Sequence, residues 1–223
     1  MKVLSPQPIM TQRAAEEIRT AILNGSLAPG TRVRQEELAS RLGVSREPIR
    51  KALLVLEREG LVRSVANRGA VIAPVDPSLI REIYEFREAV ESYIVAKIAE
   101  QKDFDPAPLQ KIIAQGRKAI RAGVLNRLIE LDLAFHAELY RASGNRVVMD
   151  VMHTQWNHIR RAMLPVLARK GYRKQVWDEH EAIVEAIAKG QPSRAASLAA
   201  THTKGARGWL TPEADESSAA APN

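Results

Sequence analysis

The sequence predicts a mainly α-helical protein with two domains, a winged helix-turn-helix domain followed by an all-helical domain. Up to Pro74 the segments are short and follow the order helix, helix, tight turn, helix, hairpin. A proline-bounded stretch, 73–77, then disfavours helix at the residues that precede its prolines. Beyond it, apolar residues recur with helical period. We therefore expect domains at 8–74 and 78–210, and a disordered tail over the small, polar residues 211–223.

The elements of the first domain follow from apolar spacing and turn residues. A first helix has one apolar stripe and ends at an Asn-Gly pair, and a second helix spans about 35–42. Gly43 breaks that helix, and Ser45 is placed to cap a third helix with its hydroxyl. Segments 61–64 and 70–73 read as the two strands of a hairpin.

Composition favours a cytoplasmic protein with a polyanionic partner. The net charge is +7 and the sequence pI about 9.9, and up to Pro74 there are 12 Lys and Arg against 7 acidic residues. The absence of cysteine excludes disulfides and cysteine-based zinc modules. The first ten residues do not resemble a signal peptide, and no run approaches the ~20 apolar residues of a membrane span.

Polar side chains on the third helix are the candidate DNA-reading residues. Gly43 and Val44 supply the small and apolar residues of a helix-turn-helix turn. Arg46 lies in the first turn of the helix, where its fork matches the two acceptors of guanine, and Arg50 shares its face. The other candidates are Ser45 and, at the wing, Asn67 and Arg68. The alternative is a solvated basic face on an ordinary bundle.

The motif around these residues resembles the DNA-binding domain of the GntR family. The matching segments are Pro29-Gly30-Thr31-Arg32-Val33, Glu37-Leu38-Ala39, Leu42-Gly43-Val44-Ser45-Arg46, Pro48-Ile49-Arg50, Ala52-Leu53, Glu59-Gly60-Leu61-Val62 and Asn67-Arg68-Gly69-Ala70-Val71. The resemblance implies operator contacts by Ser45, Arg46, Arg50 and Gly69. Glu47 stands where that family commonly has Thr and Lys51 where it has Glu, which puts the operator sequence in doubt.

Arg87 is the candidate effector-binding residue of the second domain. It shares one side of a long helix with Glu91 and with apolar residues. A charge on such a stripe lies at a rim or has a partner, so Arg87 either pairs with an anionic ligand or forms an ion pair with Glu91.

Asp132, His136, His180 and His202 are candidate metal ligands. Asp132 and His136 are four residues apart on one helix face, as a ligand pair requires, although such a pair is more often structural. Three histidines and a carboxylate suffice for a divalent ion and leave positions for a ligand or water. Spacing alone does not show that the helices carrying His180 and His202 converge on this pair.

The second domain resembles the FCD domain of the FadR subfamily of GntR regulators. The resemblance rests on Arg87 and Glu91, Asp132 with Phe135-His136, Ser143-Gly144-Asn145, Glu179-His180 with Ile183 and Ala186-Ile187, and His202. It implies an antiparallel helical bundle, a dimer, and a divalent metal held by these four ligands that helps to bind a small organic acid. The metal is zinc or else nickel, manganese or iron. The short linker favours the six-helix VanR-type version.

Together these features predict a transcription regulator, commonly a repressor in that family, that binds palindromic operator DNA as a homodimer under control of a carboxylate effector. Two alternatives remain. One is a metal-dependent hydrolase, which needs a general base such as Glu179 or Glu181 near the metal. The other is an architectural DNA-binding dimer without an effector.

Overall fold

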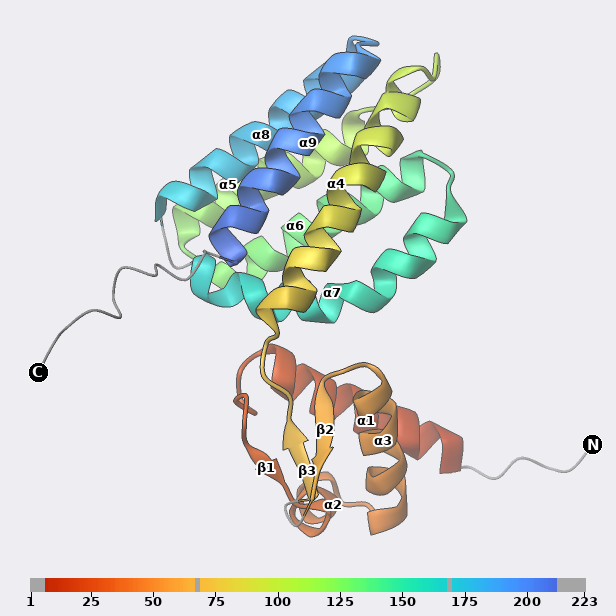
Figure 1. Cartoon of the computed structure of the whole chain (residues 1–223), viewed down its shortest axis with the longest axis vertical. Helices are drawn as coiled ribbons and strands as arrows, with labels where there is room; N and C mark the ends of the chain where they lie inside the picture. Colours follow the sequence, from red (N-terminus) through yellow and green to blue (C-terminus); the bar gives the residue numbers. More distant parts are fainter. Residues whose placement is uncertain (1–6, 67–68, 168–169, 212–223) are drawn as a thin grey trace, which may run out of the picture. The chain divides into compact units, whose positions relative to one another are not determined.

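The computed structural model describes residues 7–66, 69–167 and 170–211, and it divides the chain into two compact units, residues 1–75 and 76–223 (Figure 1). The expected fold class is confirmed, because a helix-turn-helix unit with a small sheet is followed by a unit of helices. No described helix has the length and apolar character needed to cross a membrane.

The described residues of the N-terminal unit, 7–66 and 69–75, form three helices and a three-stranded antiparallel sheet in the order β1-β3-β2. Its elements are α1 (Gln7–Leu23), β1 (Arg32–Val33), α2 (Gln35–Leu42), α3 (Arg46–Arg58), β2 (Val62–Val65) and β3 (Gly69–Ile72). The apolar residues of α3 recur at helical spacing, and Ile49, Ala52 and Leu56 are completely buried. They share one core with Ile18 and Ile22 of α1, so the core fixes α3 with its polar face outward.

Three local details differ from the expectations. Ser45 occupies the N-cap position of α3, but its side chain makes no capping hydrogen bond. The hairpin strands lie at Val62–Val65 and Gly69–Ile72 rather than 61–64 and 70–73, and the amide of Leu61, just before β2, donates to the Leu56 carbonyl at the end of α3. The two-residue strand β1, which pairs with β3, was not predicted because so short a segment has no periodic signal.

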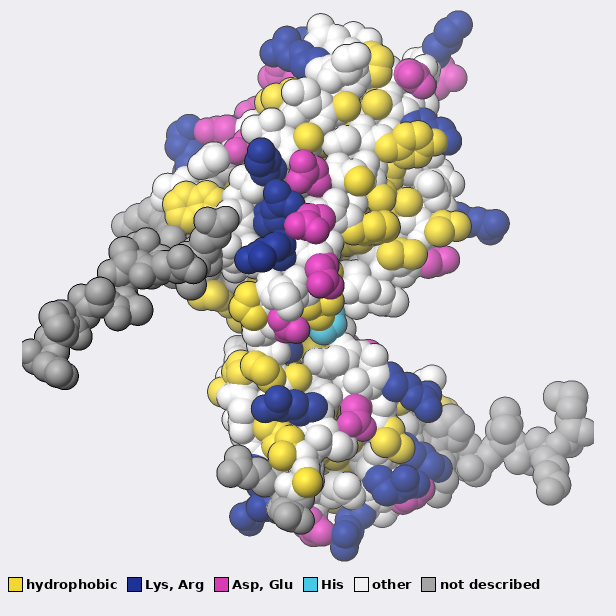
Figure 2. Space-filling view, in the orientation of Figure 1, with side chains coloured by type: hydrophobic (Ala, Val, Ile, Leu, Met, Phe, Trp, Pro, Cys, Tyr) yellow, Lys and Arg dark blue, Asp and Glu magenta, His cyan; other side chains and the backbone are white. Residues whose placement is uncertain are grey.

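The C-terminal unit consists of helices packed side by side, with α4 lying along α9 and α8 beside α9 (Figure 1). Its helices are α4 (Pro77–Ala99), α5 (Ala107–Ala122), α6 (Leu125–Ala142), α7 (Arg146–Val166), α8 (Lys170–Ala188) and α9 (Pro192–Leu210). Where α4 and α9 meet at the surface, a row of basic side chains lies beside a row of acidic ones (Figure 2), and Arg207 Nη1 is 3.5 Å from Glu85 Oε1.

Specific contacts fix the ends and the packing of these helices. Asp76 caps α4, its Oδ1 accepting from the Ser78 amide at 2.9 Å. Gly116 of α5 lies directly against the ring of the buried Trp177, where a Cβ atom would overlap the ring. Thr211, which the sequence placed in the tail, is buried and its hydroxyl donates to the Arg207 carbonyl at 3.0 Å. Residues 212–223 lie outside the described part of the chain.

Candidate DNA-reading face and metal centre

Helix α3 presents its predicted polar residues to solvent. Ser45, Arg46 and Arg50 are all exposed, while the opposite face of α3 is buried in the core. Arg46 Nη2 lies 2.9 Å from Oε1 of Glu36, a residue of α2, so the ion pair links the two helices of the helix-turn-helix. The face therefore carries two exposed guanidinium groups one helical turn apart.

Arg50 is held by Glu47 on the same helix. Arg50 Nε donates to Glu47 Oε2 at 2.9 Å and Nη2 donates to Oε1 at 2.8 Å, and Lys51 Nζ lies 3.5 Å from the same Oε1. Hydrogen bonding to Arg50, together with the charges of Arg50 and Lys51, lowers the pKa of Glu47 to about 2. Glu47 is therefore ionised at neutral pH. Sequence reasoning noted this residue as a departure from the usual Thr of the family, and did not foresee its contact with Arg50.

The end of β2 and the beginning of β3, which flank the wing, lie at the same end of the N-terminal unit as the start of α3 (Figure 1). Gly69 opens β3 in register with Val65, is exposed, and has a φ of 72°, a left-handed value that favours glycine. Asn67 and Arg68, the other predicted wing contacts, lie outside the described residues. Figure 2 shows Lys and Arg side chains on the visible face of this unit, including that end.

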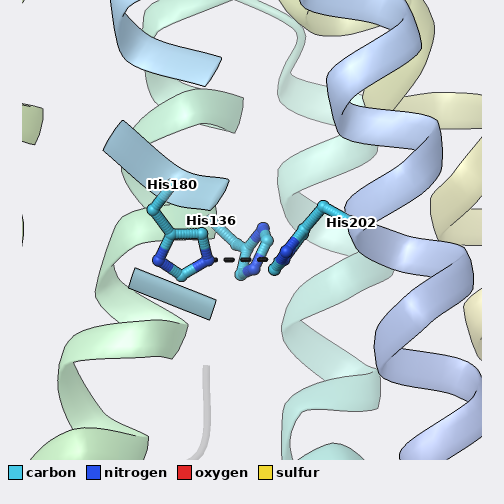
Figure 3. A group of neighbouring side chains, drawn as sticks. All are labelled: His136, His180 and His202. Carbon is cyan, nitrogen blue, oxygen red and sulfur yellow. Dashed lines mark hydrogen bonds between the residues drawn. The ribbon is translucent and has the colours of Figure 1, made fainter. Parts of the chain in front are cut away.

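The four predicted metal ligands, here called the donor cluster, come together in the C-terminal unit. His136 of α6, His180 of α8 and His202 of α9 are all buried, and their imidazoles converge (Figure 3). The Nε2 atoms of His180 and His202 are 3.3 Å apart. Asp132 completes the group, with Oδ1 3.6 Å from His180 Nε2 and Oδ2 4.0 Å from His136 Nε2.

Helix spacing and aromatic packing hold the cluster in place. Asp132 and His136 are one turn apart on the buried face of α6, as their spacing indicated. Between them on that face Phe135 stacks on the His180 ring with a centroid distance of 3.9 Å, and Trp177 packs edge-on against the same ring at 5.1 Å. Packing of α6, α8 and α9 thus brings together residues from three separate segments.

A carboxylate lies beside the outer nitrogen of two imidazoles, as a hydrogen-bond partner of His202 and in ion-pair contact with His136. Glu179 Oε2 lies 2.8 Å from His202 Nδ1, and Glu91 Oε2 lies 3.2 Å from His136 Nδ1. These contacts leave the Nε2 atoms facing one another, which is the arrangement of a carboxylate–histidine–metal site. Sequence reasoning missed both roles, because each carboxylate and its histidine lie on different helices.

Burial keeps two of the histidines neutral. It lowers the pKa of His180 well below its ordinary value, and the positive charge of Arg87 lowers it further. Burial likewise lowers the pKa of His136, although Glu91 opposes that shift. A neutral imidazole has a free lone pair, which metal binding requires.

Arg87 forms the predicted ion pair with Glu91 and retains further hydrogen-bonding capacity. Both side chains are buried, and Arg87 Nε donates to Glu91 Oε1 at 2.8 Å. The hydroxyl of Tyr140 donates to the same oxygen at 2.5 Å. The guanidinium lies over the Tyr84 ring, 4.6 Å from its centroid. Arg87 Nη2 is buried without a hydrogen-bond partner in the described structure, so it can donate to an anion that enters the site.

Two family models match the chain. The model for bacterial regulatory proteins of the gntR family matches residues 10–72, and the FCD domain model matches residues 82–205, more than half of the chain. The chain belongs to the GntR family. It is therefore a transcriptional regulator of the GntR type with an FCD domain, as the sequence motifs predicted.

Named relatives agree with this GntR assignment. Over 192 residues the chain is 31% identical to an uncharacterised helix-turn-helix transcriptional regulator of Streptomyces ambofaciens, covering 84% of this chain and 79% of the relative. It is 26% identical over 186 residues to the gluconate operon transcriptional repressor of Bacillus subtilis, covering 78% and 74%. The fold matches a GntR regulator structure from Rhodococcus sp. RHA1 with a TM-score of 0.78 at 23% identity, covering 92% and 98%.

Proposed function

We propose that this GntR regulator is a homodimeric repressor whose affinity for a palindromic operator is controlled by a small organic acid bound beside a divalent metal ion. The donor cluster is the observation that carries the proposal, because three buried histidines from three helices converge and the Asp132 carboxylate lies 3.6 Å from one of them. The described C-terminal residues form six helices that start directly after the linker, which supports the VanR-type version of the FCD domain.

The DNA-binding half of the proposal rests on the exposed face of α3 and on Gly69. In this proposal Arg46 and Arg50 contact base edges in the major groove, while Ser45 and the wing contact the DNA backbone. One such unit touches few base pairs, so a second copy of the chain supplies the other half-site. Two-fold symmetry of the dimer accounts for a palindromic operator.

The donor cluster fits a divalent ion. Two imidazole nitrogens bound at ~2.0–2.1 Å to one tetrahedral ion lie roughly 3.3 Å apart, and the Nε2 atoms of His180 and His202 are 3.3 Å apart. Asp132 and His136 supply the remaining ligands, and the donor set of three imidazoles and one carboxylate suits zinc, with nickel, manganese and iron as the other candidates. A bound ion would supply a Lewis-acidic anchor for a carboxylate.

Arg87 is the second anchor for the effector. Its Nη2 is the buried, unpartnered donor described above, and an acid oxygen there forms a charge-assisted hydrogen bond. A ligand held by Arg87 contacts α4, and a ligand reaching the donor cluster contacts α6, α8 and α9 as well. Repression is the outcome suggested by relatives such as the Bacillus gluconate operon repressor.

The contacts of two glutamates weigh against the hydrolase alternative. Glu179 pairs with His202 Nδ1, and Glu181 pairs with Arg117, so both glutamates flanking His180 have other partners than a metal-bound water. The architectural-dimer alternative leaves the buried Arg87 donor and the donor cluster without a role.

The decisive experiment is metal analysis of the purified protein together with operator binding in the presence of chelator and of small carboxylic acids. We expect about one metal ion per chain, lost in H136A and H180A but kept in H153A, a control that removes an exposed histidine of α7. We also expect one acid to change operator affinity in the wild type and to lose that effect in H180A. Operator binding that no acid and no chelator alters would refute the effector mechanism and favour the architectural dimer.

A further inference from the structure

Glu47 lies in the first turn of α3, beside the guanidinium that is to read the operator. Its carboxylate accepts both hydrogen bonds from one edge of Arg50, formed by Nε and Nη2. Both groups are about half exposed, with 51% of the Arg50 side chain and 44% of the Glu47 side chain accessible. The Glu47–Arg50 ion pair therefore lies on the exposed face of α3, opposite the face that is buried in the core.

A guanidinium group has five N–H donors arranged along two usable edges. Glu47 occupies the edge of Nε and Nη2, which leaves the outer edge of Nη1 and Nη2 with free N–H groups. That outer edge matches the N7 and O6 acceptors of guanine in the major groove. Arg50 can thus contact guanine while it stays bound to Glu47.

We propose that Glu47 is a positioning residue that holds Arg50 for bidentate contact with guanine. In this way Glu47 sets the base preference at the base pair that Arg50 contacts. The proposal rests on the function proposed above, in which α3 contacts the operator. An arginine side chain has many rotamers, and some of them would place its guanidinium on a DNA phosphate instead of on a guanine. A carboxylate beside Arg50 restricts those rotamers and repels phosphates.

Arg46 shows how this arrangement differs from an ordinary surface ion pair. Its partner Glu36 belongs to α2 and contacts it through Nη2. Glu47 instead contacts Arg50 with both oxygens from the same helix, and Lys51 lies 3.5 Å away to balance its charge. Replacing Glu47 therefore acts on Arg50 without disturbing the packing of α2 against α3.

The test is selection of bound sequences from a randomised duplex DNA library by the full-length protein. The variants are E47Q, R50A and the double variant, and E37Q serves as control because it removes the same charge from an exposed residue of α2. We expect R50A to lose a guanine preference at one base pair of each half-site. E47Q should reduce guanine preference at that same pair roughly tenfold and leave the other positions unchanged. E47Q should have no further effect in the R50A background.

Two results would overturn the inference while operator recognition stands. One is an E47Q variant that selects the same base frequencies as the wild type. The other is an E47Q variant that binds all DNA more tightly by the same factor as E37Q, since net charge alone then explains the change. A wild-type protein that selects no sequence at all would refute the proposed function, and the role of Glu47 with it.

Discussion

The substitution Glu91→Gln removes one charge from the buried ion pair with Arg87 and keeps the shape of the side chain. Arg87 and Glu91 are 1% and 2% exposed, and the Nε–Oε1 distance is 2.8 Å. Two unit charges at that distance attract by about 6 kcal/mol at an effective dielectric constant of about 20. The amide oxygen of glutamine still accepts a hydrogen bond, so part of the contact survives. We expect the free energy of unfolding to fall by about 3–5 kcal/mol, the cost of leaving a buried charge unpaired.

Tryptophan fluorescence during urea unfolding measures this loss of stability in the C-terminal unit, which contains Arg87 and Glu91. All three tryptophans of the chain, Trp156, Trp177 and Trp209, belong to the C-terminal unit. The protein should be treated with chelator first, because Glu91 also contacts His136. The control E88Q neutralises a partly exposed glutamate of α4 and should cost less than about 1 kcal/mol.

A double-mutant cycle separates the ion pair from other effects. R87M alone leaves the Glu91 carboxylate buried, whereas R87M with E91Q leaves no charge, so the two losses should not add. Two results would contradict this reasoning. One is a free energy of unfolding of E91Q within about 1 kcal/mol of the wild-type value, and the other is a double variant whose loss equals the sum of the two single losses.

Three further predictions concern packing, pH and metal. G116A should destabilise the C-terminal unit by about 1–3 kcal/mol, because its methyl group overlaps the Trp177 ring. The control G205A, with open space around its Cβ atom, should not. Equal losses of the two variants in urea unfolding would contradict this prediction. Metal-free protein should lose stability as the pH falls below about 6.5, because the unfolded chain then binds protons at histidines whose pKa is lowered by burial in the folded state. H180N should reduce the slope of unfolding free energy against pH, and an unchanged slope would contradict this prediction. Zinc added to chelator-treated protein should raise the melting temperature of the wild type but not of H180A, and an equal rise in both would place the ion elsewhere.

The sequence predicted the parts of the DNA-reading face that depend on local order. The bounds of α2 and the exposure of Arg46 and Arg50 follow from apolar spacing and from Gly43, whose φ of 64° ends α2. The bidentate contact of Glu47 with Arg50 was not foreseen, although its spacing of three residues along a helix permits it. A periodic pattern shows which residues share a helix face, but it does not show which of several nearby partners a side chain contacts.

The donor cluster was predictable only in part. The pair of Asp132 and His136 is visible as a spacing of four, since both residues belong to one helix. The approach of His180 to His202 depends on how α8 packs against α9, and residue spacing does not determine helix packing. Motif resemblance supplied that information. The contact between Glu179 and His202 has no local signal, because the partners are separated by 23 residues.

The uninterrupted course of α4 has a mechanical consequence. Asp76 fixes the first turn of this helix, and Arg87 lies on the same helix eleven residues later. At 1.5 Å per residue that separation is about 16 Å of rigid rod. A tilt of about 5° centred on Arg87 moves the start of the rod by roughly 1.4 Å. A ligand that tilted α4 at the Arg87 guanidinium would therefore also displace the first turn of the helix, which follows Asp76 directly.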